Sequence, residues 1–333
     1  MQKKRIVALR RLKDHHLQRL REEFEVVYFE EPELQPEAVS AALRQAHGLI
    51  GGKLQVGEAL LDGAPELEAV ATISVGYDNL PVAELSRRAI VLTNTPDVLT
   101  ETTADTGFLL IMASARRAVE LANLVREGRW TDHVSERHFG CDVHGKTLGM
   151  VGLGRIGQAI ARRALGFNMR VVYSNASPKP VLESQWGLQQ LTLDQLLAES
   201  DFVCLTVPLT EQTEHLLGYP QCQAMKRSAF LINISRGRVV DEAGLIRALD
   251  EGLIAGAGLD VFEREPLQHD SPLMRMANVV TLPHIGSATH ETRDAMARCA
   301  VENICQALRG ERPRDLVNPE ARPGGFAQQQ EKP

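Results

Sequence analysis

Short apolar runs alternate with amphipathic segments along the first 95 residues of the chain. Runs of about five apolar residues are typical of buried parallel strands, and apolar positions three or four residues apart are typical of helices that pack on them. The alternation predicts βαβ units and a parallel sheet. The expected strands are Arg5–Leu9, Glu25–Phe29, Gly48–Gly51, Ala69–Ile73 and Ile90–Thr93, and the expected helices are Asp14–Glu23, Pro36–Arg44 and Pro81–Arg88.

A second alternation of the same kind begins at Thr147. Its expected strands are Leu148–Gly152, Arg170–Ser174, Leu188–Leu191, Phe202–Thr206, Ala229–Ile234, Gly256–Asp260 and Val279–Leu282. Its expected helices are Ile156–Leu165, Leu193–Glu199 and Asp241–Glu251, with a last helix over Thr289–Arg309. The predicted fold class is α/β, with two Rossmann-like or flavodoxin-like parallel-sheet domains.

A long helical pattern and an irregular segment separate the two alternations. The pattern predicts one helix over Glu101–Glu127, because threonines precede it and Gly128 can end it. The segment Arg129–His144 lacks a clean period and contains a tryptophan and a phenylalanine. An apolar arm over about residues 115–145 favours contact with a second subunit, so we expect a homodimer. The tail Pro319–Pro333 is rich in Pro, Gly and Gln and is predicted to be disordered.

Composition excludes several classes of protein. The 333 residues carry a net charge of −6, with 44% hydrophobic and 24% charged residues, as expected for a soluble protein of about two domains. No apolar run approaches the roughly 18–20 residues of a membrane span, and the run Ile6–Leu9 is too short for a signal peptide. The acidic balance argues against nucleic acid as a partner. Five cysteines without a C-x-x-C pair favour reduced thiols and a cytoplasmic location.

Other charged residues carry weaker signals. The pairs Arg10-Arg11 and Arg116-Arg117 are interpreted as solvated faces of helices rather than a basic binding patch. Histidines such as His15 and His16 are interpreted as surface residues, because their spacing matches no metal-binding pattern. No metal site is therefore expected.

A glycine-rich loop follows the first strand of the second alternation. Gly152, Gly154 and Gly157 form the pattern G-x-G-x-x-G between an apolar strand and a helix, which is the context of a dinucleotide-binding loop. The first glycine permits a tight turn, the second lets the backbone approach a pyrophosphate, and the third allows close packing of helix and strand. The helix N-terminus then offers N–H groups to the phosphates.

The end of the next strand bears on the choice of cofactor. NAD sites usually place an acid there, about 20 residues after the loop, on the ribose 2′-hydroxyl. This chain has no acid at that place but offers Ser174, Asn175, Ser177 and Lys179. Hydroxyl, amide and ammonium groups tolerate a 2′-phosphate that a carboxylate would repel. We therefore expect NADP(H) to be preferred, with NAD(H) as an alternative.

Three polar residues follow successive predicted strands. Arg236 follows Ala229–Ile234, Glu265 follows Gly256–Asp260, and His284 follows Val279–Leu282. Open α/β sheets bind ligands at the carboxyl ends of their strands. An arginine, a glutamate and a histidine beside a dinucleotide loop indicate hydride chemistry on an acid.

The chain resembles the D-isomer-specific 2-hydroxyacid dehydrogenase family, and within it the glyoxylate/hydroxypyruvate and 2-ketogluconate reductase branch. The resemblance extends over roughly residues 5–319. The motifs that carry it are Ser74-Val75-Gly76-Tyr77-Asp78, Gly152–Gly157, Ile234-Ser235-Arg236-Gly237, Leu259-Asp260-Val261-Phe262, Glu265-Pro266 and Pro283-His284-Ile285-Gly286-Ser287.

The resemblance implies a role for each catalytic candidate. Arg236 would bind the substrate carboxylate and C2 carbonyl oxygen, with the backbone N–H groups of Val75 and Gly76 on the other side of the carboxylate. His284 would be the general acid, and Glu265 would hydrogen-bond its imidazole and favour the imidazolium form. The remaining cofactor contacts would come from Thr103, Arg155, Ile156, Val207, Pro208, Thr213, Ile234, Gly286 and Asp260, the last accepting from the nicotinamide carboxamide.

The same resemblance implies a discontinuous domain arrangement. Residues 1–98 and 288–333 would bind the substrate, residues 99–287 would bind the dinucleotide, and the active-site cleft would lie between the two domains. Lys53 and Leu54 would face the far end of the substrate. Arg137, in the arm, would reach the active site of the partner subunit and leave room for a polyhydroxylated substrate such as 2-ketogluconate.

Two alternatives stay open. One is an NAD-linked D-2-hydroxyacid dehydrogenase for another substrate, such as D-lactate or phosphoglycerate; the short C-terminal tail leaves no room for an added regulatory domain. The other is a nicotinamide-sensing regulatory protein that shares the fold but lacks turnover. The expected ligands are therefore a small 2-keto or 2-hydroxy acid and a nicotinamide dinucleotide.

Overall fold

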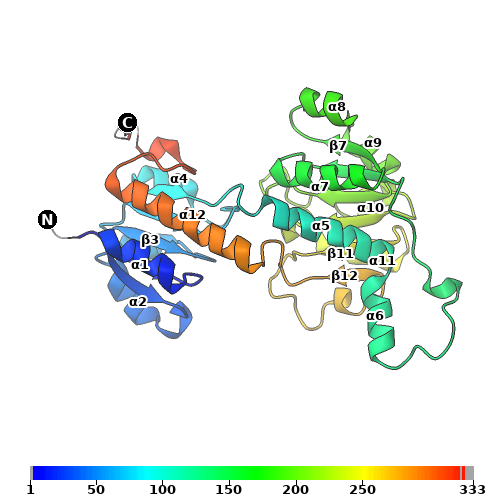
Figure 1. The fold of residues 1–333 in the computed structure, drawn as a ribbon, viewed down its shortest axis with the longest axis horizontal. Helices are drawn as coiled ribbons and strands as arrows, with labels where there is room; N and C mark the ends of the chain where they lie inside the picture. Colours follow the sequence, from blue (N-terminus) through cyan, green and yellow to red (C-terminus); the bar gives the residue numbers. More distant parts are fainter. Residues whose placement is uncertain (1–2, 323–324, 327–333) are drawn as a thin grey trace. The chain divides into compact units, whose positions relative to one another are not determined.

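The structure is a computed structural model that describes residues 3–322 and 325–326. The chain divides into two compact units, Met1–Leu99 with Ala288–Pro333 and Thr100–Ser287 (Figure 1). Within the described ranges, no helix combines the length and the apolar character that a membrane span requires.

The first unit is built on a five-stranded parallel sheet. Its strands are β1 (Arg5–Leu9), β2 (Glu25–Phe29), β3 (Gly48–Gly51), β4 (Ala69–Thr72) and β5 (Val91–Thr93), in the order β2-β1-β3-β4-β5. Its helices are α1 (Asp14–Glu23), α2 (Pro36–Leu43), α3 (Glu58–Asp62), α4 (Val82–Arg87) and α12 (His290–Arg309). Helix α12 comes from the end of the chain and packs against β3, β4 and β5. Every residue of β3, β4 and β5 is buried. Burial on both faces of these strands accounts for their continuous apolar sequences.

The second unit is built on a seven-stranded parallel sheet in the order β12-β11-β10-β9-β6-β7-β8. Its strands are β6 (Thr147–Val151), β7 (Arg170–Ser174), β8 (Gln189–Gln190), β9 (Phe202–Leu205), β10 (Phe230–Asn233), β11 (Gly256–Leu259) and β12 (Val279–Thr281). Its helices are α5 (Thr100–Ala115), α6 (Ala118–Arg126), α7 (Arg155–Gly166), α8 (Pro180–Trp186), α9 (Leu193–Glu199), α10 (Tyr219–Ala224) and α11 (Glu242–Asp250). The strand order reverses between β6 and β9, so a ligand site is expected at the carboxyl ends of these strands.

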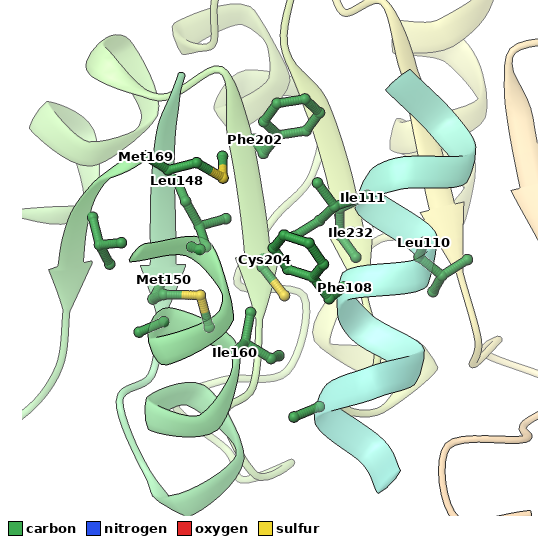
Figure 2. Packing of buried hydrophobic residues seen from close by; sticks show 14 of the residues in the cluster. Phe108, Leu110, Ile111, Leu148, Met150, Ile160, Met169, Phe202, Cys204 and Ile232 are labelled. Atoms are coloured by element: carbon green, nitrogen blue, oxygen red, sulfur yellow. The ribbon is translucent and has the colours of Figure 1, made fainter. Parts of the chain in front are cut away.

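The core of the second unit lies between the sheet and helices α5 and α7. Phe108 and Ile111 of α5 and Ile160 of α7 meet Cys204 of β9 and Ile232 of β10 there (Figure 2). A second buried cluster on the opposite face joins the sheet to α9, α10 and α11. The two-sided burial fixes the sheet and therefore the positions of the loops that follow its strands.

The single helix predicted over Glu101–Glu127 is wrong, because the chain breaks it between α5 and α6. Arg117 adopts a left-handed conformation with φ of 53°. The backbone N–H of Cys141 donates to the Ala115 carbonyl at 2.8 Å, so the returning arm takes an acceptor that a continuing helix would use. Gly140 lies so close to this carbonyl that a Cβ there would collide with it.

Several shorter elements also differ from the predicted ones. Helices α3, α8 and α10 have seven residues or fewer and were not predicted, and the strand expected over Leu188–Leu191 is paired only at Gln189–Gln190. The arm contains a 3₁₀ turn over Glu136–His138. The predicted disorder over Pro319–Pro333 is wrong for Pro319–Ala321, which form a 3₁₀ turn. Apart from residues 322, 325 and 326, the rest of that tail lies outside the described residues.

Candidate active site

Arg236, Glu265 and His284 lie at the carboxyl ends of three neighbouring strands. The order β12-β11-β10 places the loops that carry His284, Glu265 and Arg236 side by side at one edge of the sheet. Parallel neighbours are about 4.8 Å apart, so β10 and β12 lie within about 10 Å of each other. The three residues are therefore brought together by the topology of one unit.

A hydrogen bond joins His284 to Glu265. The distance from His284 Nδ1 to Glu265 Oε2 is 2.7 Å, and Glu265 Oε1 accepts from the Phe262 backbone N–H at 3.2 Å. Burial raises the pKa of Glu265, but this effect is outweighed. The pKa lies below its usual value because of the hydrogen bond and charge of His284, the Phe262 N–H and the charge of Arg236. The carboxylate is thus ionised at neutral pH beside an imidazole that is 49% exposed.

The loop that carries Arg236 is fixed by its neighbours. Asn233 Oδ1 accepts from the Ser235 backbone N–H and hydroxyl at 3.0 and 2.8 Å, and its amide donates to the Arg236 carbonyl at 2.9 Å. Gly237 lies directly against Phe262, where a Cβ would overlap the Phe262 carbonyl group. Gly237 therefore lets the loops after β10 and β11 approach each other, which places Arg236 near Glu265. Asn233 and Gly237 had no predicted positioning role, because their partners lie in tertiary structure.

Asp260 is buried, with 1% of its surface exposed. Its two carboxylate oxygens accept from the backbone N–H groups of Ile285 and Gly286 at 2.7 and 2.8 Å. Burial raises the pKa of Asp260, while these two N–H groups act in the opposite direction. A Cβ on Gly286 would contact both Asp260 and Thr103, at 3.2 and 3.3 Å. The three predicted cofactor residues therefore meet, and Asp260 holds the loop that carries His284.

The glycine-rich loop has the geometry that its sequence predicts. Gly152 has φ of +92°, and a Cβ there would lie 2.9 Å from the Val207 side chain. A Cβ on Gly157 would lie 2.6 Å from the Gly152 carbonyl oxygen. By contrast, a Cβ on Gly154 would meet no protein atom within 4 Å. The loop thus packs tightly at its first and third glycines and is open at the second, before α7. These residues fit a dinucleotide, because a phosphate can approach the backbone at Gly154.

The loop after β7 lies against the glycine-rich loop. Gly152 N–H donates to the Ser174 carbonyl at 2.9 Å, and Leu153 N–H donates to Asn175 Oδ1 at 3.3 Å. The Asn175 amide also donates to the Ser177 carbonyl at 2.8 Å. The Asn175 side chain was expected to contact the ribose, but both of these side-chain hydrogen bonds hold the protein backbone. The exposed Ser177 and the half-buried Lys179 are the better placed of the predicted phosphate contacts.

The other predicted cofactor residues occupy different environments. Ile234 is buried with the core between α5 and the sheet, and Ile156 packs at the edge of the same core. Arg155 is exposed at the first turn of α7. The Thr213 hydroxyl donates to the Pro208 carbonyl at 2.6 Å and so shapes the loop after β9, which begins near Val207. These residues therefore lie at, or next to, the carboxyl ends of β6, β9 and β10, which carry the glycine-rich loop and its neighbours.

The predicted substrate residues of the first unit also follow strand ends. Val75 and Gly76 follow β4, and the Val75 carbonyl accepts from the buried Asn94 amide at 2.8 Å. Lys53 follows β3, is exposed, and has φ of 53°. Leu54 differs from the prediction, because its side chain is 2% exposed and belongs to the core. Only its backbone is available to a ligand, and its carbonyl accepts from Asn79.

Arg137 lies in the 3₁₀ turn of the arm, with an exposed side chain. Its Nε donates to His138 Nε2 at 3.3 Å, and its carbonyl accepts from Arg117. No residue of the catalytic group described above contacts it within the described part of the chain. Its expected reach into a partner's site therefore remains a prediction.

His15 and His16 differ from the expected surface histidines. His16 is 3% exposed, and its Nε2 lies 3.4 Å from Asp294, which also lies 2.9 Å from His15 Nε2. This group of three could hold a metal ion by distance alone. However, His16 Nδ1 accepts from the Lys13 backbone N–H at 3.2 Å, so the neutral ring carries its proton on Nε2 and does not offer a lone pair toward Asp294. Asp294 also pairs with Arg298 at 3.2 Å, so its carboxylate already has a cationic partner in the protein.

The larger unit has the features of a nicotinamide-dependent oxidoreductase. It combines a dinucleotide-binding loop at the reversal of strand order with an imidazole, a carboxylate and a guanidinium at neighbouring strand ends.

Comparison with known proteins identifies the family. Residues 108–286 match the NAD-binding domain of the D-isomer specific 2-hydroxyacid dehydrogenases. The chain is 53% identical over 306 residues to glyoxylate/hydroxypyruvate reductase B of Yersinia enterocolitica, covering 91% of this chain and 94% of that protein. The chain belongs to the D-isomer specific 2-hydroxyacid dehydrogenase family and is an NAD(P)-dependent enzyme of it.

Solved structures show the same fold. A protein from Thermus thermophilus is 42% identical, with a TM-score of 0.84 over 94% of this chain and 99% of that one. The NADPH-dependent glyoxylate/hydroxypyruvate reductase of Sinorhizobium meliloti, in complex with NADP and malonate, is 35% identical, with a TM-score of 0.85 over 96% and 98% of the two chains. The predicted α/β fold with two parallel sheets is confirmed.

Proposed function

We propose that this enzyme reduces hydroxypyruvate to the D-2-hydroxy acid and glyoxylate to the achiral glycolate, and that it prefers NADPH. The observation that carries the proposal is the 2.7 Å hydrogen bond between His284 and Glu265, beside Arg236 and on the same sheet as the glycine-rich loop. The similarity to a glyoxylate/hydroxypyruvate reductase along nearly the whole chain supports the choice of substrates.

The reaction requires one hydride and one proton. A nicotinamide dinucleotide held at the glycine-rich loop Gly152–Gly157 would supply the hydride. His284 donates the proton to the carbonyl oxygen as negative charge develops there, and Glu265 stabilises the imidazolium before the transfer. Arg236 binds the substrate carboxylate through its fork of donors and polarises the carbonyl. The backbone N–H groups of Val75 and Gly76, which follow β4, are proposed as further donors to the carboxylate.

The preference for NADPH rests on the loop after β7. No acid occupies Ser174–Lys179, so no carboxylate opposes a ribose 2′-phosphate. Ser177 offers a hydroxyl group and Lys179 an ammonium group that can both bind phosphate oxygens. The bound NADP in the Sinorhizobium meliloti reductase supports the same choice.

The arm supports a homodimer. Trp130, Val134 and Phe139 expose 61%, 56% and 61% of their surfaces, and Val119 and Val125 on α6 are also exposed. An apolar group of this kind is typical of a subunit interface. All five cysteines are free thiols, which fits the expected cytoplasmic location. In such a dimer Arg137 would approach the partner's site and admit 2-ketogluconate as a further substrate.

Initial rates test the proposal. NADPH and NADH are compared at matched concentrations, each with glyoxylate, hydroxypyruvate and 2-ketogluconate. We expect the highest kcat/KM with NADPH and hydroxypyruvate or glyoxylate. Turnover with NADH alone would refute the assigned cofactor preference, and turnover of none of the three acids would refute the proposed reaction. Arg137→Ala is expected to lower kcat/KM for 2-ketogluconate more than for glyoxylate.

A further inference from the structure

A buried tyrosine hydroxyl holds the loop that follows β7. Tyr173 is the fourth residue of this strand, and none of its surface is exposed. Its ring belongs to the core between the sheet and helices α5 and α7, and Leu182 and Trp186 of α8 pack against the same core. An unpaired hydroxyl group in a core is destabilising, so a buried tyrosine requires hydrogen-bond partners. The partners of Tyr173 therefore show what this residue holds in place.

Both partners of the hydroxyl lie at the start of α8. The oxygen accepts from the Lys179 backbone N–H at 2.7 Å, and the O–H donates to Glu183 Oε1 at 2.5 Å. Lys179 stands between Pro178 and Pro180, which have no N–H, so these three residues offer a single backbone donor. The backbone of Tyr173 begins the loop after β7, and its hydroxyl binds the other end of that loop.

The hydroxyl is a donor to Glu183 at neutral pH. Burial raises the pKa of Tyr173, the hydrogen bond and charge of Glu183 act in the same direction, and the Lys179 N–H acts against them. The phenol therefore keeps its proton and can satisfy the carboxylate. Glu183 is half-buried, and in the described ranges of the chain no cation pairs with it.

Helical spacing would otherwise favour an ion pair between Glu183 and Lys179. The two residues are four apart, and the Glu183 N–H donates to the Lys179 carbonyl at 3.0 Å, as in a helical turn. Oppositely charged side chains at this spacing are neighbours and attract each other. Among the residues that the structure describes, however, no acid forms an ion pair with Lys179, and the Glu183 carboxylate lies on the Tyr173 hydroxyl instead.

An available Lys179 ammonium is what the proposed binding of a ribose 2′-phosphate requires. Lys179 is the one cationic residue of the loop Ser174–Lys179. A pair with Glu183 would neutralise this charge and would place a carboxylate beside the phosphate, which opposes the binding of NADPH. A hydrogen bond that engages Glu183 elsewhere prevents both effects.

We propose that Tyr173 is a positioning residue for cofactor selectivity, because its buried hydroxyl holds the Glu183 carboxylate and leaves the Lys179 ammonium available to the 2′-phosphate of NADPH. The inference rests on the proposed preference for NADPH and names the residue that maintains it. Tyr173 is enclosed in the core, so it acts through Glu183 and Lys179 and not by its own contact with the cofactor.

Removal of the hydroxyl tests the proposal. Tyr173→Phe keeps the ring and removes both hydrogen bonds of the side chain. The Kd values for NADPH and NADH are measured by fluorescence titration, and selectivity is the Kd for NADH divided by that for NADPH. Selectivity is expected to fall about tenfold, as for the loss of one charge-assisted contact, through weaker binding of NADPH. Unchanged selectivity would overturn the inference.

Removal of the Glu183 charge distinguishes competition by the carboxylate from distortion of the loop. Glu183→Gln alone is expected to keep the wild-type selectivity, because its amide oxygen can accept from Tyr173. In the double variant Tyr173→Phe/Glu183→Gln, selectivity is expected to return close to the wild-type value, since no carboxylate competes for Lys179. A double variant as unselective as Tyr173→Phe would show that distortion of the loop is the cause and would overturn the assigned role.

A second pair of variants tests whether the effect passes through Lys179. Lys179→Gln is expected to lower selectivity about tenfold, because the cation of the loop is removed. Adding Tyr173→Phe to Lys179→Gln is expected to change selectivity no further, since no ammonium is left for Glu183 to occupy. A full additional loss would show that Tyr173 acts by another route, against the proposal.

Tyr219→Phe is the matched control. Tyr219 lies in α10 and donates its hydroxyl hydrogen to Glu251, next to the core on the opposite face of the same sheet. The change removes the same atom from a tyrosine–glutamate pair, so selectivity is expected to equal that of the wild type. A loss as large as that of Tyr173→Phe would show a general effect of the substitution and would refute the specific role of Tyr173.

Binding measured without a keto acid separates this inference from the proposed reaction. If no keto acid is reduced but Tyr173→Phe loses selectivity, the proposed reaction fails and the role of Tyr173 stands. If hydroxypyruvate is reduced with NADPH preferred and Tyr173→Phe keeps the wild-type selectivity, the inference fails and the proposed function stands. A wild-type selectivity near one would refute both the cofactor preference and the inference.

Discussion

Replacing Gly154 by alanine tests whether the glycine-rich loop approaches a ligand. A Cβ at this position would meet no protein atom within 4 Å, and the backbone there is extended, with φ of −74° and ψ of −165°. The folded protein therefore has room for the methyl group. A phosphate held at the N-terminus of α7 would not, because the backbone N–H groups must lie within hydrogen-bonding distance of its oxygens.

The expected magnitudes differ for stability and for binding. Gly154 is the N-cap residue of α7, where alanine is less favourable than glycine by about 0.5–1 kcal/mol. That loss lowers Tm by about 1–4 °C for a unit of this size. Loss of one or two charge-assisted hydrogen bonds to phosphate, at about 1.5–3 kcal/mol each, raises the Kd for NADPH by about 10-fold to more than 100-fold.

The assay is NADPH binding by fluorescence titration, with Tm measured on the same samples. Gly166→Ala is the matched control, because Gly166 ends the same helix and a Cβ there also meets no atom within 4 Å. It is expected to leave the Kd unchanged and to leave Tm equal or slightly higher. Wild-type affinity in Gly154→Ala would refute the close approach of the loop to the phosphates. A large fall in Tm would refute the statement that the methyl group fits.

Three further variants test the site and the cluster around His16. Glu265→Gln keeps a hydrogen-bonding group beside His284 but removes the negative charge. The kcat/KM is expected to fall about 100-fold, and a wild-type value would contradict the role of the charge. Gly237→Ala forces the loops at Phe262 apart and displaces Arg236, so kcat/KM is expected to fall by about 100-fold or more, whereas a wild-type value would show that the close approach is dispensable. Burial lowers the pKa of His16, the charge of His15 acts in the same direction, and the charge of Asp294 acts against them. The unfolded chain therefore binds a proton more readily than the folded protein does. As a result, the free energy of unfolding falls as the pH drops below about 6.5. His16→Gln, which keeps an acceptor for the Lys13 N–H, is expected to lose less stability than the wild type between pH 7.5 and pH 5.5, as measured by urea unfolding.

The strands and the group at their ends could be predicted because both depend on local sequence. Arg5–Leu9, Glu25–Phe29, Gly48–Gly51 and Arg170–Ser174 are strands over the residues expected, because their apolar residues are bounded by polar and turn residues. Parallel strands align their carboxyl ends, so a residue that follows a strand can be placed at the ligand edge from sequence alone. This reasoning applies to Arg236, Glu265 and His284 without any knowledge of their contacts.

Features that depend on distant partners could not be predicted. The break before α6 depends on Gly140 and Cys141, which follow it by more than twenty residues. The need for glycine at position 237 depends on Phe262, and the need for glycine at position 52 depends on the Arg11 side chain. In each case the decisive contact is tertiary, and a single sequence without known contacts does not contain its signal.

Backbone conformation at the strand ends explains why residue positions were easier to predict than side-chain orientations. Arg11, Lys53 and His284 follow β1, β3 and β12, and each has a φ between 49° and 68°, the range of the non-glycine left-handed residues. Local propensity disfavours this conformation, so it persists only where hydrogen bonds and packing around it over-determine it. At His284 two sets of hydrogen bonds stabilise this conformation. The His284 backbone N–H donates to the Leu282 carbonyl at 3.0 Å, and the N–H groups of the next two residues donate to Asp260. The conformation turns the imidazole toward Glu265 instead of along the strand. The orientation of these side chains therefore depends on left-handed turns that their own sequence does not favour.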